Sequence, residues 1–331
     1  MNNNTFIFYL STWTFPRHLI LNIRLYTIFV NNILYIYEYG IYSKRRLFLN
    51  ACKYGLCDIV QKLYDKIVDI RIVIDSALRL ASKHNHYDII QFFCNNNVYK
   101  YANTSIALRF AAIKGHFKIV KLLCINNTNI HEYNDYAVRY ASMHGHINVV
   151  KLLVHYGANI HANNNNALRN ACYNGHYDIA KFLINNGADI HALNDNALYV
   201  ACNNGHYKLV KLLVRNGANI YDANNLSLCW AARKGYDIVK FLIKSGANVR
   251  SNNNYALTWM CKYGHYKVAK LLIENGADIH SDDDYALLNA MEYAHYDIVK
   301  LLIANGANVY ILDRRYRHSN KFLFDQDITN V

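Results

Sequence analysis

Histidine is the residue of this chain that most invites a metal-binding interpretation, since the sequence holds 16 of them and imidazole is a common zinc ligand. Eleven of them recur at two fixed places. Seven of them directly follow a recurring glycine position: His86, His116, His146, His176, His206, His265 and His295. The other four are the last residue of a short segment similar to Gly-Ala-Asp-Ile-His: His131, His161, His191 and His280. Because a residue that returns at a regular interval has the same task in each copy, we interpret these histidines as structural caps. We predict no metal site.

Carboxylates that could act as paired acid and base catalysts also come in identical copies. Five aspartates stand at the start of the same short apolar segment, where negative charge suits a helix dipole: Asp58, Asp88, Asp178, Asp237 and Asp297. The chain has no GxxxxGK[ST], no GxGxxG after a strand, no HExxH and no GxSxG motif. We therefore predict no enzymatic activity, no cofactor and no small-molecule substrate. Catalytic residues would have to lie in residues 1–44 or 311–331, which are short and lack such motifs.

The 8 cysteines follow neither a disulfide framework nor zinc-ligand spacing. Four of them share one place, three residues before the recurring glycine: Cys52, Cys172, Cys202 and Cys261. We expect these to be small buried side chains. Buried thiols without partners favour a reducing compartment, so we predict a cytoplasmic protein, with the nucleus as an alternative.

The elements that carry these residues repeat along the chain. Gly-His pairs begin at Gly115, Gly145, Gly175, Gly205 and Gly264, and Gly55, Asn85, Gly235 and Ala294 fill the same position elsewhere. The interval is 30 residues, except for 29 between Gly235 and Gly264, where the histidine is missing. The sequence therefore predicts nine repeats from about Leu47 to Tyr310, inside a repeat domain of residues 45–310.

Each repeat reads as two short helices. In the fifth repeat Ala167, Leu168, Ala171 and Cys172 form the apolar stripe of a first helix, which Gly175 ends. The second helix, YDIAKFLINN from residue 177 to 186, is apolar on more than one side. A single helix pair cannot bury that much apolar surface, whereas stacking between like neighbours can. We predict an all-α solenoid.

Substitutions at the glycine positions support this prediction. Asn85 replaces the first glycine of its repeat, and Asn97 and Asn127 replace the second glycine of theirs. Asparagine tolerates positive φ better than most residues, so a left-handed backbone is expected at each of these positions. Ala294 is expected to adopt the same backbone at a cost of about 1–2 kcal/mol.

The segment GHINVVKLLVHYGANI, residues 145–160, resembles the GHxxVVKLLLxxGADVN segment of ankyrin repeats, and most other repeats resemble it too. The Asn- and Tyr-rich composition is most similar to ankyrin proteins of giant DNA viruses of amoebae. The resemblance implies an ankyrin-type solenoid. Family repeats have 33 residues, and Asn166-Ala167-Leu168-Arg169 replaces the family's Thr-Pro-Leu-His. We therefore expect tight loops, with weak or absent hairpin fingers.

The resemblance also implies where a partner protein would bind. The two positions before the recurring glycine vary between repeats and would line the concave groove of the family. Basic and aromatic residues gather there: Lys114, His144, Tyr173, Arg233, Lys234, Lys262 and Tyr263. Such residues are frequent at binding hot spots. The alternative is that they are solvated helix ends.

A second candidate surface is a row of arginines. Arg79, Arg109, Arg139 and Arg169 each lie six residues before the glycine position, so stacked repeats would place them in a ladder. The ladder could meet an acidic protein segment or phosphates, or it could be a row of exposed charges with no partner.

The net charge of +13 bounds the choice of partner. We predict a monomeric, non-catalytic scaffold for another protein with an acidic surface, a host protein if the chain is viral. The alternative is sequence-independent binding of nucleic acid or another polyanion. We predict no membrane association. Residues 1–44 carry no repeat and are a cap or a docking segment, and residues 311–331 are a tail with a basic cluster of Arg314, Arg315, Arg317 and His318.

Overall fold

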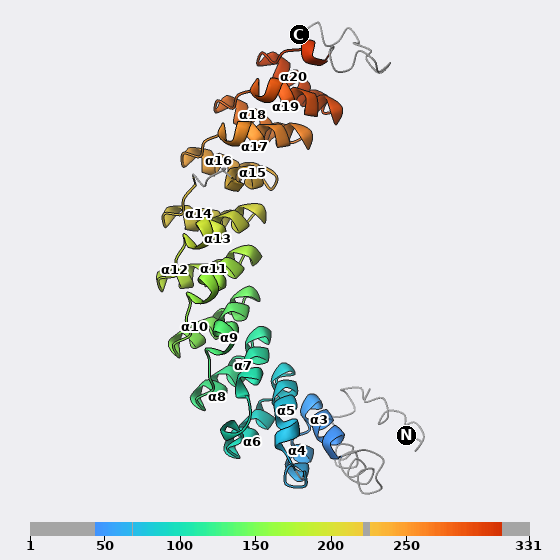
Figure 1. Ribbon diagram of the computed structural model, residues 1–331, viewed down its shortest axis with the longest axis vertical. Helices are drawn as coiled ribbons and strands as arrows, with labels where there is room; N and C mark the ends of the chain where they lie inside the picture. The colour runs from blue at the N-terminus through green and yellow to red at the C-terminus, as the bar shows by residue number, and fades with distance from the viewer. Residues whose placement is uncertain (1–43, 68, 221–225, 313–331) are drawn as a thin grey trace, which may run out of the picture. The chain divides into compact units, whose positions relative to one another are not determined.

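The structure is a computed structural model that describes residues 44–67, 69–220 and 226–312 (Figure 1). The chain divides into two compact parts, Met1–Ile130 and His131–Val331. Apart from Lys44, the predicted N-terminal segment lies outside the described residues, as does the basic cluster of the predicted tail.

The described residues are all-helical and contain no strand, as the sequence predicts. The first part holds α3 (Lys44–Tyr54), α4 (Cys57–Tyr64), α5 (Arg71–Lys83), α6 (Tyr87–Asn95), the short 3-10 helix η2 (Val98–Lys100), α7 (Thr104–Lys114) and α8 (Phe117–Ile125). The second part holds α9 (Glu132–Met143), α10 (Ile147–His155), α11 (Ala162–Asn174), α12 (Tyr177–Asn185), α13 (Ala192–Asn203), α14 (Tyr207–Arg215), α15 (Leu226–Ala232), α16 (Tyr236–Lys244), α17 (Ser251–Lys262), α18 (Tyr266–Glu274), α19 (Ser281–Glu292) and α20 (Tyr296–Ala304).

Helix pairs stack in register within each part, which confirms the predicted solenoid. In the second part α11 packs between α9 and α13, and α12 packs between α10 and α14. Figure 1 accordingly shows α9, α11 and α13 along one side and α10, α12 and α14 along the other. Ala171 and Cys172 of α11 and Leu183 of α12 are fully buried, so each pair closes its apolar surface only with its neighbours.

The link between repeats is a left-handed turn that the sequence did not predict in detail. Three consecutive residues with φ between +52° and +57° stand near the starts of α9, α11, α13, α17 and α19: 133–135, 163–165, 193–195, 252–254 and 282–284. All are Asn or Asp except Tyr133 and Leu193. Asn and Asp tolerate this backbone better than other non-glycine residues, which explains why they occupy most positions of these turns. The turn takes the place of the hairpin finger.

The third residue of each turn joins two repeats. The side chain of Asn165 is buried, and its Oδ1 accepts from the backbone N–H of Asp189 at 2.9 Å, while Nδ1 of His161 lies 3.2 Å away. Asp195 does the same with Asn219 and His191. The histidines that close the Gly-Ala-Asp-like segments therefore have the structural role that we predicted.

The histidines of the Gly-His pairs are structural too, but their mechanism differs from helix capping. They stand at N-cap positions without a side-chain cap bond. Instead, Nε2 of His176 lies 3.0 Å from the carbonyl oxygen of Met143 in the preceding repeat, and His206 reaches Tyr173 in the same way. Because a carbonyl only accepts, Nε2 carries the hydrogen. We call this contact the histidine bridge; His86, His116 and His295 also form it.

The residues that replace glycine have the left-handed backbone that we predicted, whereas one of the recurring glycines does not. Asn85, Asn97, Asn127 and Ala294 all have positive φ, between +57° and +64°. Gly235, however, has φ 167° and is extended rather than left-handed. The missing histidine shortens this repeat by one residue, and α15 ends at Ala232, so residues 233–235 connect it to α16.

Candidate protein-binding surface

The described residues include many His, Cys, Asp and Glu side chains that could carry chemistry. They contain no group of three or more His, Cys, Asp or Glu that could hold a metal ion. None of the eight cysteines forms a disulfide, and burial raises the pKa of Cys172 and of Cys261 to about 12. No described helix is both long and apolar enough to span a bilayer.

Most residues predicted to bind a partner are accessible. Lys114, His144, Arg233 and Lys234 are exposed, and Lys262 is half-buried. The side chains of Tyr173 and Tyr263 are 53% and 44% exposed. They stand at the carboxyl ends of the first helices, where the helix has finished contributing to the core.

The predicted arginine row has an intrachain role in the second part. Arg139 is buried, and its guanidinium donates to the carbonyl oxygens of Asn134 and Tyr133, both at 2.8 Å. Arg169 donates to Asn164 and Asn163 of its own left-handed turn, and burial lowers its pKa. The expectation of an exposed charge ladder is therefore wrong at Arg139. These arginines hold the turn in place of the family's Thr-Pro-Leu-His residues.

The two arginines of the predicted row that lie in the first part, Arg79 and Arg109, are half-buried. The guanidinium of Arg79 lies over the ring of Phe110, 5.9 Å from its centroid. A role in partner binding for Arg79 and Arg109 stays a prediction.

A group of basic and aromatic residues, three of them exposed and three half-buried, lies at the carboxyl ends of α15, α17 and α19. The guanidinium carbon of Arg233 is 4.9 Å from the ring centroid of Trp230, 5.4 Å from Trp259 and 5.8 Å from Tyr263. A cation within about 6 Å of an aromatic face is attracted by the ring quadrupole. Three rings from two repeats thus surround one guanidinium.

The neighbouring cation is held in a similar way. The ammonium of Lys262 lies 5.1 Å from the ring centroid of Tyr293, in the next repeat. A side-chain hydrogen bond with Tyr293 raises the pKa of Lys262. We call Trp230, Arg233, Trp259, Lys262, Tyr263 and Tyr293 the Arg233 cluster.

Arg233, Lys262 and Tyr263 were predicted from the sequence, and Tyr293 lies at one of the two positions predicted to line the groove. Trp230 and Trp259 were missed. Only the two positions directly before the glycine were considered as groove residues. Trp230 and Trp259 each lie five residues before the glycine, one helical turn earlier on the same face. The signal was present, because Tyr255, Trp259 and Tyr263 follow one another at intervals of four along α17. Their rings pack in a row, with centroids 5.2 Å and 5.1 Å apart.

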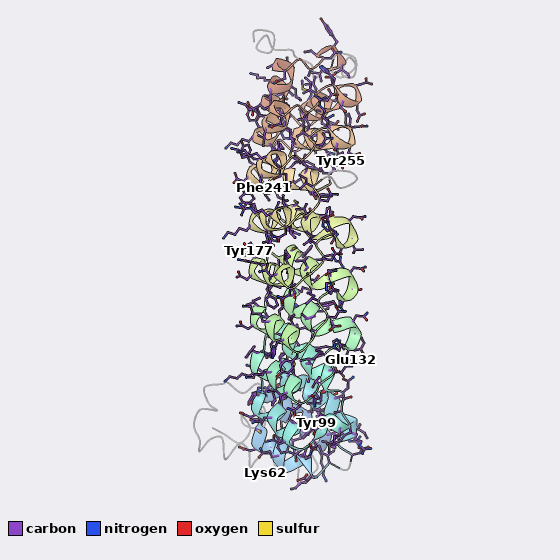
Figure 2. The ribbon with its side chains drawn as sticks, turned by 90° about the vertical axis from the view of Figure 1, so that its left-hand side faces the viewer. Lys62, Tyr99, Glu132, Tyr177, Phe241 and Tyr255 are labelled. Atoms are coloured by element: carbon purple, nitrogen blue, oxygen red, sulfur yellow. The ribbon has the colours of Figure 1, made fainter. Side chains whose placement is uncertain are left out.

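The second helices carry cations over tyrosines as well, which provides an internal comparison. Lys211 lies 4.4 Å from the ring centroid of Tyr207 and Lys240 lies 5.5 Å from that of Tyr236. Each of these pairs is confined to one helix. In Figure 2 Tyr177 and Phe241, from second helices, lie on one side, and Glu132 and Tyr255, from first helices, lie on the other.

Comparisons with known proteins identify one family. The family model described as ankyrin repeats (3 copies) matches residues 48–134, 125–194, 191–253 and 228–313. Among solved structures, the human ASB11 ankyrin repeat domain is similar, with a TM-score of 0.48 and 23% identity over 55% of this chain and 96% of that chain. A comparison with curated proteins found no match. Because the family matches run from residue 48 to residue 313, the chain belongs to the ankyrin repeat family.

Membership of this family indicates the general class of function. Ankyrin repeats are in general protein-interaction modules, and the family is in general non-catalytic. The resemblance to viral members stays a prediction, as do the partner and the face that binds it.

Proposed function

We propose that this protein is a non-catalytic scaffold that binds another protein through the carboxyl ends of its first helices, the face that is concave in this family. The observation that carries the proposal is a contrast within each helix. In α11, Ala171 and Cys172 are fully buried and belong to the repeated frame, whereas the next residue, Tyr173, is 53% exposed. The same boundary lies between Cys261 and Tyr263 in α17.

Energetic considerations also favour this face. Tyrosine and arginine are enriched among residues that dominate binding energy, because they bury large areas and offer hydrogen-bonding groups. Tyr173, Arg233, Tyr263 and Tyr293 place such groups at one or the other of the two positions before the glycine in four repeats. Histidine bridges hold the backbone at Tyr173 and at Lys262, next to Tyr263, which reduces the entropy lost on binding.

The finer features of the proposal follow from charge and composition. The net charge of +13 supports a partner with an acidic surface. The resemblance to repeats of giant DNA viruses supports a host protein as that partner and the host cytoplasm, or the nucleus, as the place of action. We propose that the chain binds as a monomer.

The proposal is tested by affinity capture from a nuclease-treated eukaryotic lysate at physiological salt, followed by mass spectrometry. The variant Tyr173→Ala/Tyr263→Ala removes two exposed rings from the first-helix ends. The matched variant Tyr236→Ala/Tyr296→Ala removes two exposed rings from the second helices. We expect a stoichiometric protein that the first variant loses and the second retains. Equal capture by both variants would contradict the proposal.

The same experiment addresses polyanion binding, which the net charge also favours. Nucleic-acid binding predicts recovery of nucleic acid before nuclease treatment and of no protein after it. It also predicts an affinity that falls steeply with salt. That pattern would replace the scaffold with the alternative function.

A further inference from the structure

The Arg233 cluster is chemically specific enough to indicate the kind of segment that it binds. We propose that it binds a segment of the partner rich in Asp and Glu, whose carboxylates pair with Arg233 and Lys262. This inference rests on the proposed function and adds the chemistry of the partner.

The guanidinium of Arg233 is held before any partner arrives. Contacts with Trp230, Trp259 and Tyr263 limit its rotamers, although the side chain stays exposed. Much of the entropy that a free arginine loses on binding is therefore already lost. The planar guanidinium matches a carboxylate in a bidentate pair, the geometry with the strongest charge-assisted hydrogen bonds.

The local charge around the cluster is positive. Lys234 follows Arg233 directly and is exposed, and Lys262 comes from the next repeat. Glu292, beside Tyr293, is an exposed acidic residue at the edge of the cluster. Three cations and one carboxylate leave a net positive charge at the cluster. An acidic segment would neutralise this charge, whereas a neutral or basic segment would not.

The arrangement of the rings favours an acidic protein segment over nucleic acid. Binding of single strands depends on aromatic faces on which bases can stack. Here Trp259 packs against Tyr255 and Tyr263, and Arg233 lies over both tryptophans. Trp230 also has an edge contact with Tyr199, 6.2 Å between centroids. The cluster thus presents cationic and hydroxyl groups at its surface, which suit carboxylates.

Tryptophan fluorescence gives a local readout of this binding. The chain has 3 tryptophans, so Trp13→Phe leaves only Trp230 and Trp259, both in the cluster. The full-length Trp13→Phe protein is titrated with a synthetic peptide in which Asp and Glu alternate with Gly and Ser. An Asn/Gln peptide of the same length and an oligothymidylate of the same charge serve as the comparison probes.

We expect the acidic peptide to change the emission and to bind more weakly as salt rises. Arg233→Glu/Lys262→Glu should weaken binding by at least about tenfold. The matched variant Lys211→Glu/Lys240→Glu makes the same change of charge on second helices and should weaken it by at most about threefold, since those charges lie outside the cluster. Arg233→Lys keeps the charge but loses the bidentate geometry, so its affinity should fall between those of the unchanged protein and the double variant.

Three outcomes would overturn the inference: equal binding of the acidic and amide peptides, equal losses in the two double variants, or tighter binding of the oligothymidylate. Circular dichroism checks that each variant is folded, and Arg233→Lys keeps the test decisive if a double variant is not. If the peptide fails while Tyr173→Ala/Tyr263→Ala still abolishes capture, only the acidic specificity is wrong. If those tyrosines do not affect capture, the proposed function itself is wrong.

Discussion

At the scale of single residues, the asparagines of the left-handed turns have two distinct tasks. All three residues of a turn must tolerate positive φ, but only the third is buried and bonded to the next repeat. Asn164 and Asn165 illustrate the difference, with φ of +57° and +55°. Asn164 is exposed, whereas the Asn165 side chain accepts from Asp189.

The variants Asn164→Ala and Asn165→Ala separate these tasks. Both should lose about 1 kcal/mol or somewhat more of unfolding free energy, because alanine is strained in the left-handed region. Asn165→Ala should lose roughly 1–3 kcal/mol in addition, since the Asp189 N–H is left without its acceptor. Urea unfolding measures both. Equal losses in the two variants would show that the bond between repeats contributes little.

A second comparison isolates the close approach of the histidine bridge. Gly175 and Gly187 have similar φ, +82° and +88°, so alanine is strained at both. A Cβ at Gly175 would lie 2.7 Å from Cε1 of His206, whereas a Cβ at Gly187 meets no atom within 4 Å. Gly175→Ala displaces the ring and breaks the bond from His206 to Tyr173.

We expect Gly187→Ala to cost about 1–2 kcal/mol and Gly175→Ala to cost roughly 0.5–1.5 kcal/mol more. Thermal or urea unfolding provides the measurement. In a His206→Ala background the ring is absent, so the two alanines should then cost the same. A difference that persists in that background would exclude the histidine bridge as its cause.

At the scale of elements, the seventh repeat departs from the others. Its loop lacks the histidine, so no histidine bridge can reach the carbonyl of Asn203. The side chain of Lys234 occupies that space instead, with its Cβ 3.4 Å from where a Cβ on Gly205 would be. We therefore expect the junction between the sixth and seventh repeats to be weaker than the junction between the fifth and sixth, which His206 bridges.

Inserting a histidine between Gly235 and Tyr236 restores both the loop length and the ring. The new bond to Asn203 should stabilise α15 and α16 by about 0.5–1.5 kcal/mol, seen as slower amide hydrogen exchange in these helices. Alanine inserted at the same place is the control for loop length. If both insertions slow exchange equally, the ring is not responsible.

Most helices and their buried faces could be predicted from the sequence, because the same pattern recurs in every repeat and each copy supports the interpretation of the others. The apolar positions of α11 and α12 and the left-handed Asn85 and Asn97 follow from periodicity and backbone preference. The left-handed turn was less accessible, because three consecutive residues in this conformation are rare and strings such as Asn163–Asn165 also look like compositional bias. The Arg233 cluster needed the relative placement of neighbouring repeats, and the burial of Arg139 depends on carbonyls exposed only by the turn.

At the scale of the whole molecule, stability is expected to be a sum over repeats and junctions rather than one cooperative term. Repeats seven to nine lie beyond a junction that has no histidine to form a bridge, so they should unfold at lower denaturant than repeats five and six. Cys172 and Cys261 report on either side of this junction. Both have pKa values of about 12 because of burial, so both should resist alkylation near neutral pH while folded.

Pulsed alkylation at increasing urea, read by mass spectrometry, follows the two thiols separately. Cys261 should become labelled at lower urea than Cys172. The histidine insertion after Gly235 should bring the two midpoints closer together. A single midpoint for both thiols in the unmodified chain would indicate that the junction does not divide the second part.

The central claim is that the function resides in the carboxyl ends of the first helices, and site-specific photo-crosslinking tests it most directly. A photoreactive amino acid replaces Tyr173 or Tyr263 in one set of proteins, and Lys181 or Lys270, exposed on the second helices, in another. After capture from lysate and irradiation, we expect one protein partner to crosslink to the first set and not to the second. Crosslinks from Lys181 and Lys270 alone, or to nucleic acid alone, would contradict the account.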